Sequence, residues 1–314
     1  MFDLRCLSVS LAFFLFSYCL FSAVVGHTWE LAGGLANRLS ARRWSDLLFI
    51  FRCFPLIAAS VVTLAFVIPS FLLLEPRVSS EPLGEVPLFL GLCCLALFAS
   101  GIWNAARAHA QTSETVANWM SEATAVQSHE PVAVFRIRPD VPALTVAGIC
   151  TPKVLLSNAA ARVLTETEFQ TALRHEVAHV RRRDNLKKLF FRLLAFPGMS
   201  TLEAAWGEAE EIAADDSAVR SVDDALDLAS ALIKLSRFAP VQPSATLTTA
   251  LVTSPTASLN LRVARLLSWN EKQAHRGLSL GFVLLPVLGA FAFSLAMYGS
   301  LLTEIHSLTE FLVR

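Results

Sequence analysis

The chain has 314 residues, of which 54% are hydrophobic, and its 26 basic residues are balanced by 26 acidic residues. This hydrophobic fraction is too high for an ordinary soluble protein, and the zero formal net charge gives no sign of a nucleic-acid partner. The six cysteines include no C-x-x-C pair, and most of them lie in long apolar stretches. That distribution argues against a disulfide framework and against a thiolate metal site.

Long apolar stretches without a charged residue run over residues 6–25, 53–74, 86–103 and 278–302. Each is close to the ~20 residues that a helix needs to cross a bilayer. The first could instead be a cleaved signal peptide, although its apolar run exceeds the roughly 7–15 residues typical of that signal. We therefore predict an α-helical polytopic membrane protein with about four transmembrane helices, which makes the lipid bilayer one expected partner.

The loops between these stretches predict the orientation of the chain. Arginines dominate the loop before residue 53, whereas glutamates dominate the loop before residue 86. Because basic loops stay in the cytoplasm, the first loop is predicted inside and the second outside. Residues 1–103 would then form three transmembrane helices, residues 104–277 a cytoplasmic domain, and residues 278–314 a fourth transmembrane helix with a short outer tail.

The first part of the cytoplasmic segment has a strand pattern. Residues 105–130 are polar and helix-prone, and we expect them to extend the third span. Residues 132–138 alternate apolar and basic side chains, and residues 143–157 are rich in β-branched residues. Both stretches predict short strands, and the second is expected to supply a sheet edge on which an extended peptide can pair.

The second part has a helix pattern. Capping boxes formed by Thr165 with Glu168 and by Ser200 with Glu203 predict two helices. A third helix is predicted to start at Ser221, and a fourth lies within residues 258–268. Residues 242–256 are expected to form an exposed loop, so the inner domain is predicted to be a small sheet followed by helices.

The first predicted helix carries the stretch His175-Glu176-Val177-Ala178-His179. Residues four apart on a helix share one face, so both imidazoles can reach one metal ion. Glu176 lies close by and can act as the base that takes a proton from a zinc-activated water. The bare pattern also arises by chance, so a third ligand is needed to support a zinc site.

Glu211 is the candidate third ligand on the second predicted helix. Asp215 follows one turn later and can accept the N–H of a ligand histidine. The alternative is an acidic, solvated helix face. Glu210 lies about 100° round the helix from Glu211, so the two are not expected to face one metal. Glu208 shares the face of Glu211 but has Ile212 four residues on, so Glu211 is favoured.

"HEVAHVRRRDN" followed by "EIAAD" resembles the BlaR/MecR-type antirepressor membrane metallopeptidases of bacteria. The resemblance covers essentially the whole chain and implies an α+β zincin-type domain of the HExxH, gluzincin-like kind on the cytoplasmic side of the plasma membrane. It implies that His175, His179 and Glu211 bind Zn²⁺ and that Glu176 is the catalytic base. The family's sensor–transducers carry an extracellular penicillin-binding domain after the fourth span. The printed sequence lacks that domain, so β-lactam sensing is not expected.

The HtpX and CAAX-prenyl-protease group is more distantly similar. Residues 185–196 bear on the choice between the two groups, because the HtpX group typically has true membrane spans there. In this chain the stretch mixes basic residues with apolar residues at helical spacing, which favours an interfacial helix and leaves a buried core helix as the alternative. Asp184, just before it, is expected either to pair with a neighbouring arginine or to lie on a charged helix surface.

The predicted function is a membrane-embedded zinc endopeptidase that hydrolyses peptide bonds of a protein substrate at the cytoplasmic face. By resemblance, that substrate is a transcriptional repressor or another regulator. The alternatives are a non-catalytic zinc-binding signalling or scaffold protein and an HtpX-like quality-control protease. A transporter is disfavoured because the predicted spans contain no charged residue.

Overall fold

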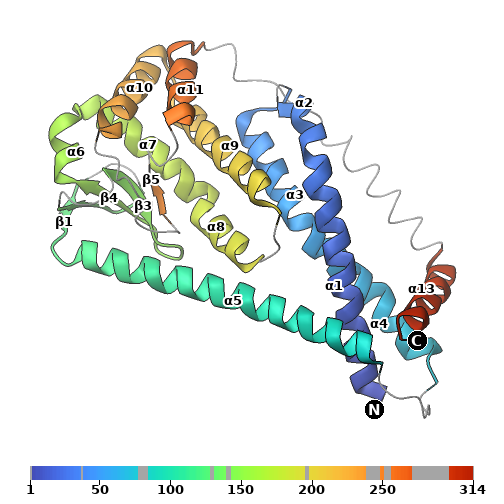
Figure 1. Cartoon of the computed structure of the whole chain (residues 1–314). Helices are drawn as coiled ribbons and strands as arrows, with labels where there is room; N and C mark the ends of the chain where they lie inside the picture. Colours follow the sequence, from blue (N-terminus) through green and yellow to red (C-terminus); the bar gives the residue numbers. More distant parts are fainter. Residues whose placement is uncertain are drawn as a thin grey trace.

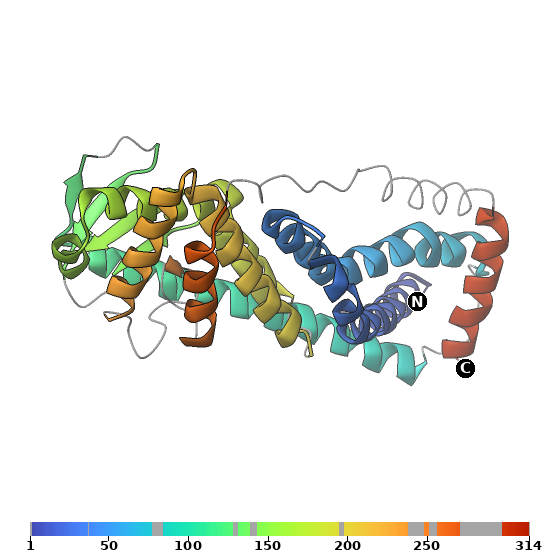
Figure 2. The same ribbon diagram turned by 90° about the horizontal axis from the view of Figure 1, so that it is seen from above.

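The computed structural model describes residues 2–36, 38–76, 84–127, 131–138, 143–194, 198–237, 248–250, 256–270 and 297–313. This part of the chain is mostly helical and contains one small sheet (Figure 1). Seen from above, the sheet and its covering helices lie at one end of the molecule, and the N-terminal helices and the C-terminal helix lie at the other (Figure 2).

Three helical segments near the N-terminus are long and apolar enough to cross a membrane. They are α1 (Phe2–Thr28) with the short η1 (Trp29–Ala32), α3 (Ala41–Val62) with η2 (Thr63–Val67) and α4 (Ile68–Leu74), and α5 (Glu85–Met120). The short α2 (Gly33–Ala36) follows η1. This confirms the three N-terminal apolar stretches as candidate membrane helices.

The predicted fourth span, residues 278–302, lies outside the described residues up to position 296. The described C-terminal residues form α13 (Tyr298–Val313), which contacts α4 and η2. The Tyr298 hydroxyl donates to the Ala65 carbonyl oxygen at 2.8 Å. The residues expected as a short tail are therefore a helix that packs on the N-terminal bundle.

The sheet has five strands in the order β1-β2-β4-β3-β5. They are β1 (Thr124–Val126), β2 (Val134–Ile137), β3 (Leu144–Ala147), β4 (Lys153–Ser157) and β5 (Thr248–Ala250). The pair β2–β4 is parallel, whereas β1–β2, β3–β4 and β3–β5 are antiparallel. The strands predicted within residues 132–138 and 143–157 are confirmed.

Helices cover both faces of this sheet. The end of α5 covers one face, and the further helices of the inner domain are α6 (Asn158–Val163), α7 (Glu166–Arg182), α8 (Asp184–Leu193), α9 (Ser200–Ala218), α10 (Val222–Ser236) and α11 (Thr256–Leu267). Successive side chains of a strand point to opposite faces. Val154 and Leu156 accordingly join the main core with α7 and α10, while Leu155 packs with Trp119 on the end of α5. The sheet therefore packs against α7 with one face and against the end of α5 with the other.

The membrane helices and the inner domain share a core where α3 meets α9. Leu48, Phe191 and Trp206 are buried there, and the rings of Phe191 and Trp206 are 4.8 Å apart. Arg52, only 1% exposed, donates from Nε to Glu203 Oε1 at 2.7 Å. These contacts tie α9 directly to the second membrane helix.

Local expectations were wrong at three places. Ser200 does not cap α9, because the capping residue is Met199 and the Glu203 carboxylate instead pairs with Arg52. The expected helical extension of the third span over residues 105–130 is confirmed as far as Met120, but α5 ends there and β1 follows. Within the expected loop 242–256, residues 248–250 form β5, and the rest up to 255 lies outside the described residues.

Candidate metal centre

Helix α7 is fixed at both ends by interactions that are local in the sequence. The Thr165 hydroxyl accepts from the Glu168 N–H at 3.2 Å, and the Glu168 carboxylate accepts from the Thr165 N–H at 2.8 Å. This is the predicted capping box, and it satisfies two amide donors at the helix start. At the other end Arg183 takes a left-handed conformation, with φ 56° and ψ 40°, and α8 begins at the next residue. The chain therefore turns sharply just after the second histidine.

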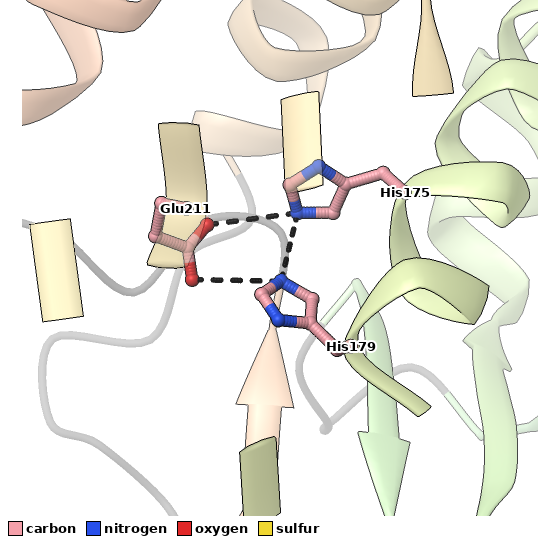
Figure 3. Close-up of side chains that lie close together, drawn as sticks. All are labelled: His175, His179 and Glu211. Atoms are coloured by element: carbon pink, nitrogen blue, oxygen red, sulfur yellow. Dashed lines mark hydrogen bonds and ion pairs between the residues drawn. The ribbon is translucent and has the colours of Figure 1, made fainter. Parts of the chain in front are cut away.

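His175 and His179 lie on one face of α7 and point toward each other from successive turns (Figure 3). Their Nε2 atoms are 3.1 Å apart, and both side chains are buried. Glu211 reaches them from α9, with its two carboxylate oxygens 3.6 Å from Nε2 of His175 and 3.8 Å from Nε2 of His179. The structure thus brings together the three side chains that were predicted as metal ligands.

These spacings fit a metal ion. Ligand atoms about 2.0–2.1 Å from a tetrahedral ion lie about 3.3 Å from one another. The three measured separations of 3.1, 3.6 and 3.8 Å bracket that value. Two imidazole nitrogens and one carboxylate form a donor set that leaves a further coordination position open. The buried group His175, His179 and Glu211 could therefore hold a metal ion.

A carboxylate lies behind each of the two imidazoles. Asp215 Oδ1 is 3.0 Å from His175 Nδ1, as predicted. Asp184 Oδ2 is 2.8 Å from His179 Nδ1, a contact that the sequence did not predict. Carboxylates in this position fix the tautomer and orientation of a ligand histidine. The left-handed turn at Arg183 is what brings Asp184 back to the helix it has just left.

Arg262 of α11 is the other residue that the sequence did not predict. Its side chain is 2% exposed, and Nη1 donates to Glu211 Oε2 at 2.8 Å. Nε and Nη2 donate to the two Asp215 oxygens at 2.8 and 2.7 Å. Arg262 therefore holds the third ligand and the carboxylate behind His175 in one network. The only signal in the sequence was an arginine on a predicted helix.

The charges in this network shift the pKa values of its members. Burial by itself raises the pKa of Glu211, but Arg262 and the two imidazoles hold it well below its usual range. Burial lowers the pKa of His175, yet Asp215 and Glu211 outweigh it and raise that pKa to about 9. Metal binding at this site would therefore release a proton from His175.

Glu176 is fully buried beside the two histidines. Neither carboxylate oxygen has a hydrogen-bond partner among the described residues. Burial raises its pKa to about 7, although the two imidazoles oppose the shift. A buried carboxylate without partners is costly, so a site that keeps one is a candidate for chemistry.

The other acidic residues of α9 occupy different positions, and of these Glu210 also lies close to His179 and Asp184. Glu208 is exposed and is not in the group that His175 and His179 form with Glu211. The Glu210 carboxylate pairs with Lys188 Nζ of α8 at 2.9 Å. Asp216 pairs with Arg265. Of the glutamates on α9, Glu211 is therefore the one whose carboxylate lies close to both imidazoles. Lys188, expected on an interfacial helix, instead faces α9.

Helix α8 has features of an interfacial helix and of a buried core helix, the two alternatives predicted for residues 185–196. Phe191 and Leu194 are buried in the protein, whereas Leu186 and Leu193 are 43% and 37% exposed. Asp184 at its start pairs with Arg182 and Lys187, in agreement with the ion-pair expectation.

A cavity of about 440 Å³ opens beside the second histidine. It is lined by His179, by Asn185 of α8 and by the β3–β4 connection, which includes Gly148. The Asn185 amide donates to the Gly148 carbonyl oxygen at 3.1 Å and fixes that connection. Gly148 has φ 97°, and a Cβ there would lie 2.9 Å from the Thr151 carbonyl oxygen, so the turn requires glycine.

The expectation that residues 143–157 supply a free edge strand was wrong. β3 lies between β4 and β5, with Thr145 opposite Ala250 and Ala147 opposite Thr248. β5 also contacts α7 and α8. The arrangement shows that this edge accepts an antiparallel extended segment close to the metal centre.

No protein-family model matches this chain, and no curated protein matches its sequence.

Proposed function

We propose that the chain is a membrane-embedded zinc endopeptidase that acts on a protein substrate at the cytoplasmic face. The observation that carries the proposal is the buried group His175, His179 and Glu211, with the unpartnered Glu176 carboxylate beside it, among the residues that the structure describes. The resemblance to the BlaR/MecR-type antirepressor peptidases favours a repressor or another regulatory protein as the substrate.

His175, His179 and Glu211 would hold the ion, and zinc there would supply Lewis acidity toward a peptide carbonyl and lower the pKa of a water. Glu176 accepts the proton of the attacking water and transfers it to the leaving amine. Its pKa of about 7 in the metal-free structure lies near neutral pH, where a group can both take and give a proton.

Substrate would bind along the cleft that includes His179. An extended segment gains backbone hydrogen bonds by adding to a sheet edge, which gives affinity with little sequence preference. In this structure β5 already pairs with the β3 edge, so an extended substrate would use that edge only by displacing β5.

The proposal also includes the orientation of the chain in the membrane. The arginines Arg38, Arg42 and Arg43 precede or begin α3, and Glu75 and Glu85 flank the segment between α4 and α5. Under the positive-inside rule this charge distribution supports a cytoplasmic inner domain. Reporter fusions after Asn104 and after Arg314 should report inside and outside respectively. Both fusions on one side would contradict the four-span topology.

The test of the proposed chemistry is Glu176→Gln in the full chain. It removes the base but keeps both histidines, so zinc should stay bound while proteolysis is lost. Mass spectrometry of new protein N-termini, in cells expressing either form, detects the cleavage of any cellular substrate. The matched control is Glu208→Gln, because Glu208 lies on α9 away from the imidazoles.

The two alternatives predict different results. A non-catalytic scaffold would give the same N-termini for both forms and still bind zinc. A quality-control protease would give many new N-termini from damaged proteins, rather than a few from regulators.

A further inference from the structure

Helix α7 borders a second cavity on a different face from the metal ligands. Its volume is about 370 Å³, and it lies between the start of α3, helix α7 and the end of α9. Arg174, Val177 and Arg181 line it at i, i+3 and i+7, whereas His175 and His179 are not among its lining residues. We call this cavity the basic pocket, after its lining cations: Arg42, Arg174, Arg181, Arg182, Lys187 and Arg220.

The basic pocket has an excess of positive charge. Asp46 is its only acidic lining residue among the described part of the chain. Asp46 pairs with Lys187, and from outside the lining Asp224 pairs with Arg174 and Asp184 pairs with Arg182 and Lys187. A recess lined by one sign of charge concentrates ions of the opposite sign.

Arg182 has buried donor nitrogens without a hydrogen-bond acceptor among the described residues. Its side chain is only 8% exposed, and Nη2 donates to Ser45 Oγ at 2.7 Å. Nε and Nη1 are buried and have no hydrogen-bond partner among the described residues. An unsatisfied buried donor is costly, and more so when it is charged. An anion in the pocket would satisfy these donors, because a guanidinium presents a fork that matches oxyanions.

We propose that the basic pocket binds a phosphate group. The excess of positive charge suits a dianion better than a single carboxylate, and arginine is the preferred partner of phosphate oxygens. A volume of about 370 Å³ accommodates a phosphate with a small organic group.

The position of the pocket favours a water-soluble phosphate over a lipid headgroup. Arg42 precedes Cys53, where the apolar stretch of α3 begins, by eleven residues. A helix rises 1.5 Å per residue, so Arg42 lies about 16 Å from that point along the helix. The headgroup layer of one leaflet is only about 5–8 Å thick.

The pocket is connected to the metal centre through Asp184. Arg182 Nε and Lys187 Nζ lie 3.6 and 3.2 Å from Asp184 Oδ1, while Asp184 Oδ2 meets His179 Nδ1. A phosphate that binds the two cations draws them away from Asp184 and leaves its charge for His179. A stronger carboxylate partner makes a histidine a better metal ligand. Phosphate should therefore tighten zinc binding, an effect that rests on the proposed function.

The direct test is calorimetric titration of inorganic phosphate into the metal-free full chain in neutral detergent at low salt. We expect saturable binding that is at least about tenfold weaker in the double variant Arg42→Ala, Arg220→Ala. Both side chains are exposed, so this variant should fold. The matched control is Arg43→Ala, which removes the neighbouring arginine outside the lining. Absence of saturable binding, or equal weakening by Arg43→Ala, would overturn the proposal.

A second measurement distinguishes the two sources of phosphate. The chain is reconstituted in nanodiscs of phosphatidylcholine, with or without phosphatidic acid, and the titration is repeated. Unchanged phosphate affinity supports a soluble ligand. Loss of phosphate binding in the phosphatidic-acid discs would show that a lipid headgroup occupies the pocket and overturn the soluble assignment.

The coupling is measured as zinc affinity, by competition with a chelator, with and without phosphate. We expect zinc to bind about fivefold tighter with phosphate in the unmodified chain and equally with and without it in the double variant. An unchanged zinc affinity in both forms would overturn the coupling. If the chain binds phosphate but no zinc, the proposed function is contradicted and the proposal of a phosphate site still stands.

Discussion

The metal-centre side and the basic-pocket side of α7 differ in the sign of the ion that each could bind. On the metal-centre side, the carboxylates of Glu176, Asp184, Glu211 and Asp215 surround two histidines, and Arg262 is the cation that pairs with the last two. On the basic-pocket side, six cations line the recess, and Asp46 is the one acidic lining residue among the described residues. The first side therefore has room for a cation and the second for an anion.

The comparison also shows where buried charge is paired. Around the metal centre, each ligand imidazole has a carboxylate partner, and Arg262 bonds to two carboxylates. In the basic pocket, Arg182 pairs with Asp184, with Nε 3.6 Å from Oδ1, but Nε and Nη1 have no hydrogen-bond partner among the described residues. A buried donor without a hydrogen bond is costly, so Arg182 identifies a place where an anion would bind.

The largest expected effect is the loss of the third ligand. Glu211→Gln should weaken zinc binding by more than the roughly 10–100-fold typical of losing an outer carboxylate. The reason is that Glu211 brings one oxygen toward each histidine, at 3.6 and 3.8 Å. Metal content of the purified variant measures the effect, with Glu208→Gln as the control. A zinc-loaded Glu211→Gln beside a zinc-free Glu208→Gln would reverse the assignment.

Removal of Arg262 should destabilise the metal-free chain next most strongly. Arg262→Ala leaves Glu211 and Asp215 buried without their cation, and breaking a buried pair on one side costs about 3–5 kcal/mol. Zinc should restore part of this loss, because the ion supplies positive charge to the same carboxylates. Thermal unfolding with and without zinc measures both effects. Equal unfolding temperatures for variant and unmodified chain would show that the acids are not held as charged groups.

Loss of a carboxylate behind a histidine should have a smaller effect. Asp215→Asn and Asp184→Asn should each weaken zinc binding about 10–100-fold, since each amide keeps the shape but loses the charge that orients an imidazole. Chelator competition measures the affinities. If only Asp215→Asn has an effect, Asp184 belongs functionally to the basic pocket rather than to the metal centre.

Local patterns were sufficient to identify the side chains that meet at the candidate metal centre. The two histidines lie one helical turn apart, Asp215 lies one turn after Glu211, and the Thr165–Glu168 capping box starts α7. Each of these relations spans about one helical turn and follows from helix geometry alone.

Relations across the fold could not be predicted in this way. Arg262 meets Glu211 and Asp215 only because α11 packs beside α9. Asp184 reaches His179 because Arg183 adopts a left-handed conformation, which is uncommon for any residue other than glycine and has no sequence signal here. Glu203 matched a capping box locally, but the buried Arg52 binds its carboxylate instead. Tertiary contacts overrode local preference at each of these positions.

The smallest expected effect comes from Arg265, one turn after Arg262 on α11. Arg265 also pairs with an aspartate of α9, with Nη2 3.0 Å from Asp216 Oδ2. Both partners are about one-third exposed, at 35% and 36%, so water already solvates their charges. Exposed pairs of this kind contribute about 0–1 kcal/mol. Arg265→Ala should therefore lower stability by less than about 1 kcal/mol and leave zinc affinity unchanged. Arg262 and Arg265 lie on the same helix but differ in burial. The difference between the unfolding temperatures of Arg262→Ala and Arg265→Ala therefore measures the effect of burial. A loss of zinc in Arg265→Ala would mean that α11 acts on the metal centre through its position, not through the Arg262 charge.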